Sequence, residues 1–257
     1  MAGGGGLGML VSGLLVPSIL EAGSIRSWPL TWLVMAGASE SLWPVVCTMR
    51  AMPPPAAPAP GAPGANTAGQ ATLLGAWPAL ASYAMFAIGY LAYLTFLVAW
   101  MREQGVGSLM IALAWALLSL LVIASPFVWR GLLSRARAGG AIAAANAVTA
   151  VAVALPLWWP GIGGMLASAM IFGLAFFVVP TAATTFCRRY FDESQWPGAM
   201  AVFTLVFAAG QVLGPVAAGM IADHGGDLGG ALAGASGVLF AGAVIALWQR
   251  PAIASRA

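Results

Sequence analysis

Charged residues are the scarcest feature of this sequence. Of the 257 residues, 7% are charged and 61% are hydrophobic, and the mean hydropathy is +0.93. Ordinary soluble domains are about 25% charged, so that class of protein is excluded. Apolar runs of about twenty residues recur along the chain instead, and each is long enough to cross a hydrocarbon layer of roughly 30 Å. We predict an all-α integral membrane protein with about eight transmembrane helices.

Lysine is absent, and histidine and cysteine are rare. All ten basic side chains are arginine, which we attribute to codon usage, so the pI near 9.3 predicts no nucleic-acid partner. The single histidine, His224, leaves no histidine-based catalytic relay, and no serine or cysteine has an evident base. Cys47 and Cys187 lack the spacing of a metal site. We expect no enzyme, cofactor or metal site, and we interpret Asp223, His224 and Asp227 as a solvated loop.

Breaks in hydropathy divide the chain into eight apolar segments. The predicted spans are 4–20, 28–49, 79–101, 108–129, 139–159, 162–186, 198–222 and 228–249. A low-complexity run, MPPPAAPAPGAPGA, separates the first two spans from the other six and favours an extended chain without packed structure. The expected parts are two transmembrane helices in 1–50, a Pro/Ala-rich cytoplasmic linker in 51–77, a six-helix half in 78–250 and a cytoplasmic tail in 251–257.

The distribution of arginine predicts the orientation. If the linker is cytoplasmic, only Arg26 and Arg102 fall on the opposite side of the membrane. The cytoplasmic group is Arg50, Arg130, Arg135, Arg137, Arg188, Arg189, Arg250 and Arg256. This bias follows the positive-inside rule. We expect the arginines that follow the fourth and sixth spans to anchor the chain at the cytoplasmic surface of the bilayer: Arg130, Arg135, Arg137, Arg188 and Arg189.

The densest cluster of charge, RRYFDESQWP, is interpreted as a membrane boundary. Arg188 and Arg189 end the sixth span, and Asp192 and Glu193 precede the seventh. Acids are favoured at the positive N-terminal end of a helix, and Pro197 suits a first helical turn. The cluster is therefore not interpreted as a reactive site.

The first two spans resemble the last two. When GLGMLVSGLLVPSILE is aligned with GQVLGPVAAGMIAD, Gly8 pairs with Gly210 and Glu21 with Asp223, and the next helix contains AGAS in both copies. Transporters built from parallel repeats show such weak symmetry. If the repeat unit is six helices, the chain is expected to begin after the first four.

Three segments carry a family resemblance: FAIGYLAYLTFLVAWMREQG, SPFVWRGLLSRARAGGA and RRYFDESQWPGAMAVFTLVFAAGQVLGPVAAGMIAD. Together they resemble the major facilitator superfamily, YbfB/YjiJ type, entered at its fifth helix. The resemblance implies a permease of the bacterial inner membrane that moves a small molecule by alternating access. The substrate is unknown, and proton coupling is one expectation. The family's loop signature has an acid where Ser134 precedes Arg135, so its salt bridge is not expected here. The alternative is a truncated, non-transporting fragment or a membrane interaction partner.

Small residues and a proline mark the seventh span. Gly210 and Gly214 are four positions apart, so they form a flat helix face, and Pro215 removes a helical hydrogen-bond donor. We predict either a hinge that changes during transport or static helix packing at these residues. Glu40 is expected near the middle of the second span, facing the bundle interior, as a candidate proton-coupling acid. The alternative for Glu40 is a poorly formed second span.

An aromatic stripe occupies the third span. Tyr83, Phe86, Tyr90 and Tyr93 are spaced three, four and three residues apart, so they share one face of a helix. The resemblance places this helix beside the substrate cavity, whereas packing is the alternative. The candidate cavity residues are Tyr83, Tyr90, Tyr93, Asn146 and Gln211. Interhelical hydrogen bonds are the alternative role for Asn146 and Gln211.

Overall fold

The computed structural model describes residues 2–22, 28–41, 43–44, 47, 72–136, 139–225 and 227–251. Within these ranges every regular element is a helix. Residues 11–68 form one compact unit, and residues 1–10 together with 69–257 form the other. Most of the predicted linker and tail, 51–71 and 252–257, lies outside the described residues.

The larger unit contains six helical segments that are long and apolar enough to cross a membrane. They are α4 (Trp77–Glu103), α5 (Ser108–Arg135), α6 (Gly140–Trp158), α7 (Ile162–Ala175) continued by α8 (Val178–Tyr190), α9 (Trp196–Gly225) and α10 (Leu228–Leu247). These segments coincide with the six spans predicted between residues 79 and 249. The predicted fold class, an all-α membrane protein, is confirmed.

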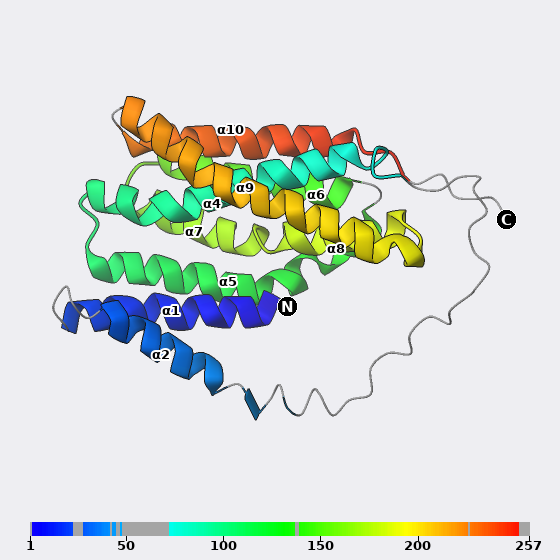
Figure 1. Ribbon diagram of the computed structural model, residues 1–257. Coiled ribbons are helices and arrows are strands. Elements are labelled where there is room, and N and C mark those ends of the chain that lie inside the picture. Colours follow the sequence, from blue (N-terminus) through cyan, green and yellow to red (C-terminus); the bar gives the residue numbers. More distant parts are fainter. Residues whose placement is uncertain are drawn as a thin grey trace. The chain divides into compact units, whose positions relative to one another are not determined.

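The main helix contacts of the larger unit involve α4, α7 and α10. The helix α4 packs against both α9 and α10, α10 also packs against α6, and α7 packs against α5 and α6. Figure 1 shows α9 in yellow to orange crossing α4, with α10 in red beside it. The buried side of the bundle combines many alanines with a few large residues such as Phe86, Tyr93 and Phe172. Small residues allow the backbones to approach closely, which is how helices associate in lipid.

The start of α4 and the end of α10 lie together. The rings of Trp77 and Trp248 are 6.3 Å apart between centroids. Because successive spans alternate in direction, the ends of α5 and α8 lie on this same side of the bundle. The described arginines at this side are Arg130, Arg135, Arg188, Arg189 and Arg250, whereas Arg102 lies at the other side. The structure therefore carries the charge asymmetry that the sequence predicts.

The sixth predicted span consists of two helices. Phe176 and Phe177 form a turn between α7 and α8. Pro180 has no N–H to donate to the carbonyl of Phe176, so a regular helix cannot continue through this point with all its hydrogen bonds. The chain is consequently irregular about halfway across the span, and α8 begins as a separate helix.

The start of α9 agrees with the sequence prediction. A short 3-10 helix, η2 (Glu193–Gln195), precedes it, and Asp192 and Gln195 form a capping box. The indole of Trp196 donates to the carbonyl of Phe191 at 2.9 Å. These contacts satisfy backbone groups at a helix start, which is the role expected of a membrane boundary rather than of a reactive site.

The smaller unit contains most of α1 (Ala2–Ala22) and the whole of α2 (Trp28–Glu40). With 13 residues, α2 is about 20 Å long, which is less than the roughly 30 Å of a hydrocarbon core. Most of the predicted span 28–49 that follows Ser41 lies outside the described residues.

Candidate functional site

An aromatic cluster joins α4 to α9. The ring of Phe207 lies 5.0 Å from the ring of Tyr83 and 5.6 Å from the ring of Tyr90. Within α4, the rings of Phe86 and Tyr90 stack at 4.8 Å. Tyr83 and Tyr90 are buried inside this cluster. Two of the predicted cavity residues, Tyr83 and Tyr90, therefore occupy one apolar, π-rich environment between two helices.

Tyr90 and Gln211 are brought together by the α4–α9 contact. The amide nitrogen of Gln211 donates to the hydroxyl oxygen of Tyr90 at 2.5 Å. Polar side chains between membrane helices pair with one another, and here each side chain supplies the other's partner. This pair is the part of the predicted cavity set that the structure assembles.

Tyr93 has a different environment from the other three aromatic residues of the stripe. It is fully buried, and its hydroxyl lies 2.7 Å from the hydroxyl of Ser168 in α7. Ser168 in turn donates to the carbonyl of Ala152 in α6 at 2.6 Å, so Tyr93 is the donor to Ser168. In the structure Tyr93 connects three helices.

Asn146 is buried in α6 against α4. Its amide nitrogen donates to the hydroxyl oxygen of Ser82 at 2.8 Å and to the carbonyl of Ser82 at 3.3 Å. Its side-chain oxygen Oδ1 has no hydrogen-bond partner. The interhelical hydrogen bonds that the sequence offered as an alternative are present here, and the structure does not bring Asn146 together with Tyr90 and Gln211.

Gly210 and Gly214 lie at the crossing of α9 with α4. A Cβ atom on Gly210 would lie 2.8 Å from the carbonyl oxygen of Ala84, and one on Gly214 would overlap with the carbonyl oxygen of Ile88. Only glycine permits so close a backbone approach. Pro215 follows inside α9, where it leaves the carbonyl of Gln211 without its helical donor.

The predicted arginine anchors occupy the ends of α5 and α8. Arg130 and Arg135 are exposed at the end of α5, and Arg137 lies outside the described residues. The guanidinium of Arg189 donates to the carbonyl of Ala136 at 3.1 Å and to that of Ser134 at 3.4 Å. The end of α5 is thus held by a cation from α8.

A polar stripe on α8 was not identified from the sequence. Thr181, Thr184, Thr185 and Arg188 follow one another at helical positions i, i+3, i+4 and i+7. This spacing places them on one face of the helix, and it was readable in PTAATTFCRRY.

This stripe lines a groove of about 330 Å³ between α5 and α8. The lining residues are Ser125, Pro126, Leu133, Phe177, Val178, Thr181, Thr184, Thr185 and Arg188. Pro126 cannot donate to the carbonyl of Val122, and the hydroxyl of Ser125 donates to that carbonyl instead, at 2.8 Å. A break in the backbone ladder of α5 is therefore satisfied by a side chain at the groove wall.

Glu40 is the last residue of α2 and is exposed, and most of the predicted span that follows it lies outside the described residues. The hydroxyls of Ser39 and Ser41 bond to the carbonyls of Met35 and Ala38, which are contacts typical of a helix end.

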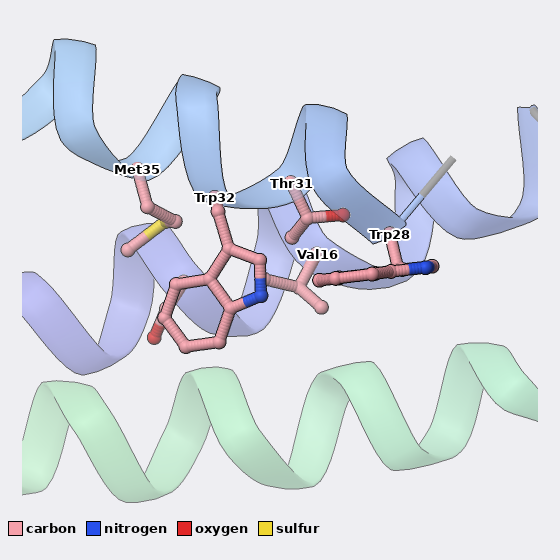
Figure 2. A pocket seen from close by; sticks show the side chains of 6 residues that line it. Val16, Trp28, Thr31, Trp32 and Met35 are labelled. Carbon is pink, nitrogen blue, oxygen red and sulfur yellow. The ribbon is translucent and has the colours of Figure 1, made fainter. Parts of the chain in front are cut away.

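A second hollow, of about 400 Å³, lies within the smaller unit. Its lining residues are Ser12, Val16, Trp28, Thr31, Trp32 and Met35, from α1 and α2. In Figure 2 the side chains of Trp28, Trp32 and Met35 project from α2 toward Val16 of α1. None of the described lining residues is ionisable.

The acidic and histidine residues near the end of α9 form helix-end contacts. The carboxylate of Asp227 accepts from the backbone N–H of Gly230 at 2.6 Å and caps α10. Nδ1 of His224 lies 2.7 Å from the carbonyl of Met220. Within the described ranges, no group of three or more His, Cys, Asp or Glu residues could hold a metal ion.

Comparison with known families gives a match over nearly the whole chain. The model of a family described as "Uncharacterised MFS-type transporter YbfB" matches residues 1–247. A comparison with curated proteins finds no match.

Proposed function

Because the chain belongs to the family of YbfB-type transporters of the major facilitator superfamily, we propose that it carries a small organic solute across the bacterial inner membrane by alternating access. Its transporter role and its multi-pass membrane location follow from the family and from the six membrane-length helices. Beyond what the family shows, we propose the mechanism, the class of solute and the orientation.

The observation that supports alternating access is the internal bracing of the six-helix unit. Polar bonds join its helices at membrane depth: Tyr93 to Ser168, Asn146 to Ser82, Gln211 to Tyr90, and the hydroxyl of Ser236 to the carbonyl of Ala150. A half braced in this way moves as one body. Alternating access by rocking of one half against another requires such rigid halves.

The direction of insertion follows the arginines. The side that holds the start of α4 and the ends of α5, α8 and α10 carries five of the six described arginines, counted from Arg102, Arg130, Arg135, Arg188, Arg189 and Arg250. Positively charged ends are retained in the cytoplasm. This side is therefore proposed to be cytoplasmic, together with the linker and the C-terminus.

Proton coupling is proposed to involve Glu40. Glu40 ends α2 in the apolar smaller unit, and carboxylates within membrane-spanning segments mark proton pathways. If Glu40 couples transport to protons, Glu40→Gln abolishes the pH dependence of uptake and leaves exchange of solute intact. If uptake by Glu40→Gln keeps the same dependence on pH, Glu40 has no coupling role.

The transport proposal is tested by a solute screen. Cells that express the full chain are compared with cells that express Gln211→Ala for accumulation or depletion of a panel of labelled organic solutes. The matched control is Gln104→Ala, because Gln104 is exposed in the loop after α4. We expect at least one solute to move with the wild type and Gln104→Ala, and to move more slowly with Gln211→Ala. If no solute crosses the membrane while the protein is inserted and folded, the proposal is wrong.

A further inference from the structure

The structure assigns a ligand class to the groove between α5 and α8. We propose that this groove binds a small organic acid, with the carboxylate at Arg188 and the apolar part of the molecule directed along the groove toward Val178. The inference rests on the proposed transport function, and it names the class of solute.

Among the described residues that line the groove, Arg188 is the only ionisable one. The guanidinium lies over the ring of Trp196, with its carbon 5.7 Å from the ring centroid. Stacking of this kind uses the flat face of the guanidinium and not its in-plane N–H donors. Those donors match the geometry of a carboxylate, which arginine binds through two parallel hydrogen bonds.

The two adjacent arginines have different surroundings. The donors of Arg189 are directed to the backbone carbonyls of Ser134 and Ala136. Those of Arg188 are beside a groove whose lining contains no carboxylate. Arg188 is exposed, and a cation at the wall of a groove with no carboxylate among its described lining residues attracts an anion.

The size and walls of the groove set the shape of the molecule. From Phe177 to Arg188 the helix rises by roughly 16 Å, at about 1.5 Å per residue. The volume of about 330 Å³ is at the lower end of the range for small-molecule sites. Pro126, Leu133 and Val178 make the remainder of the wall apolar. A molecule with one acidic end and a short hydrocarbon body fits this arrangement.

The threonine hydroxyls of the groove narrow the class of acid that would bind there. Those of Thr181, Thr184 and Thr185 donate to the carbonyls of residues 177, 180 and 181, at 3.0, 2.9 and 2.8 Å. A threonine hydroxyl has one proton and two acceptor lone pairs, so these oxygens are left to accept. A hydroxyl or amine on the bound acid would donate to them. We therefore expect hydroxylated acids to bind more tightly than plain acids of the same length.

The test uses the full chain purified in a neutral detergent without added lipid. Thermal unfolding is followed with hexanoate, with hexanamide, which has the same shape and no charge, and with 2-hydroxyhexanoate. Hexanoate is expected to raise the unfolding temperature, 2-hydroxyhexanoate to raise it more, and hexanamide to leave it unchanged. Arg188→Gln is expected to weaken hexanoate binding by about tenfold or more.

Three further variants separate the groove from general effects of charge. Arg135→Gln removes the same charge from the same side of the bundle and should bind hexanoate like the wild type. Arg188→Lys keeps the anchoring charge and should bind more weakly than the wild type, so it tests the proposal even if Arg188→Gln does not fold. Thr184→Val has nearly the same volume, and it should lose the preference for the hydroxy acid while it still binds hexanoate.

Several outcomes would overturn the assignment. One is an equal rise in unfolding temperature with hexanoate and hexanamide, and another is equal hexanoate binding by Arg188→Gln and the wild type. A third is an unfolding temperature that rises only with phosphatidylglycerol, which would assign Arg188 to a lipid phosphate. The transport proposal fails separately. If the acids bind as expected and no solute moves across the membrane, the groove is a binding site without transport. If an uncharged solute moves and no acid binds, transport stands and the ligand class is wrong.

Discussion

The side-chain oxygen of Gln249 accepts a hydrogen bond from the backbone N–H of Ala79 at 3.2 Å, across 170 positions of the sequence. Its amide nitrogen donates to the carbonyl of Gly75 at 3.1 Å and to that of Arg250 at 2.9 Å. Gln249 is only 5% exposed. One carboxamide thus satisfies orphan backbone groups at the start of α4 and at the end of α10, and it joins the two ends of the six-helix unit.

We predict that Gln249→Ala lowers the free energy of unfolding by about 1–3 kcal/mol, because the buried N–H of Ala79 loses its partner and the carbonyl of Gly75 loses a donor. Thermal unfolding of the purified chain, followed by circular dichroism, measures the loss. Gln104→Ala is the control, since Gln104 is exposed, and it should unfold at the wild-type temperature. Equal unfolding temperatures for Gln249→Ala and the wild type would contradict the prediction.

The close crossing of α4 and α9 gives a second prediction. Gly214→Ala places a methyl group against the carbonyl oxygen of Ile88, so the helices must separate. Overpacking of this kind costs about 1–3 kcal/mol. The unfolding temperature of Gly214→Ala should therefore fall.

Gly219→Ala provides the matched control on the same helix. A Cβ at Gly219 would have its nearest neighbour, a ring carbon of Phe96, at 3.8 Å, which is an ordinary contact. This variant should be neutral or slightly stabilising, since alanine is the better helix former. If the two variants unfold alike, backbone proximity at Gly214 is not a constraint. A hinge role at Gly214 would show as lost transport in a Gly214→Ala protein of unchanged stability.

The bond between Gln211 and Tyr90 is tested by a double-mutant cycle. Tyr90→Phe removes the hydroxyl and Gln211→Leu removes the amide, and each leaves one polar group unpaired between α4 and α9. The double variant should lose less free energy of unfolding than the two single variants lose in total. Coupling energies of side-chain hydrogen bonds in membranes average about 0.6 kcal/mol and reach about 1.7 kcal/mol. Additive losses would show that the two side chains do not interact.

The locations of these residues show what the sequence could predict and where it failed. Hydropathy predicted the six segments of the larger unit, because length and apolar content decide which helices can cross a bilayer. The start of α9 was also predictable, since Asp192, Glu193 and Pro197 are local signals. The turn at Phe176 was missed, although Pro180 indicates it, because the apolar run continues without interruption.

The site was less predictable than the spans. The spacing of Tyr83, Phe86, Tyr90 and Tyr93 predicted one shared face, yet Tyr93 is bonded to Ser168 of α7 and the others meet α9. Which neighbour a side chain meets depends on the crossing of helices that are distant in sequence, and no local pattern contains that information. Gln249 was missed for the same reason, because its partner is 170 positions away.

Arg189 gives a prediction about local stability. Its guanidinium holds the carbonyls of Ser134 and Ala136 at the end of α5, where helical acceptors lack partners. Arg189→Ala should speed amide hydrogen exchange in the last turn of α5 and leave exchange in α10 unchanged. Arg135→Ala removes a neighbouring charge but neither of these two hydrogen bonds, so its amide exchange in α5 should match that of the wild type. Unchanged exchange in α5 of Arg189→Ala would contradict the assigned contact.

The orientation of the chain can be tested at three positions. Reporter fusions at Ala65 and Ala138 should report the cytoplasm, and a fusion at Gly225, the last residue of α9, should report the opposite side of the membrane. The reason is the excess of arginine at the side that holds the start of α4 and the end of α10. Replacing Arg130, Arg135 and Arg189 with glutamine should weaken the bias and give mixed orientations, whereas replacing Arg102 should strengthen it. A fusion at Gly225 that reports the cytoplasm would reverse the orientation, and with it the side from which the Arg188 end of the groove opens.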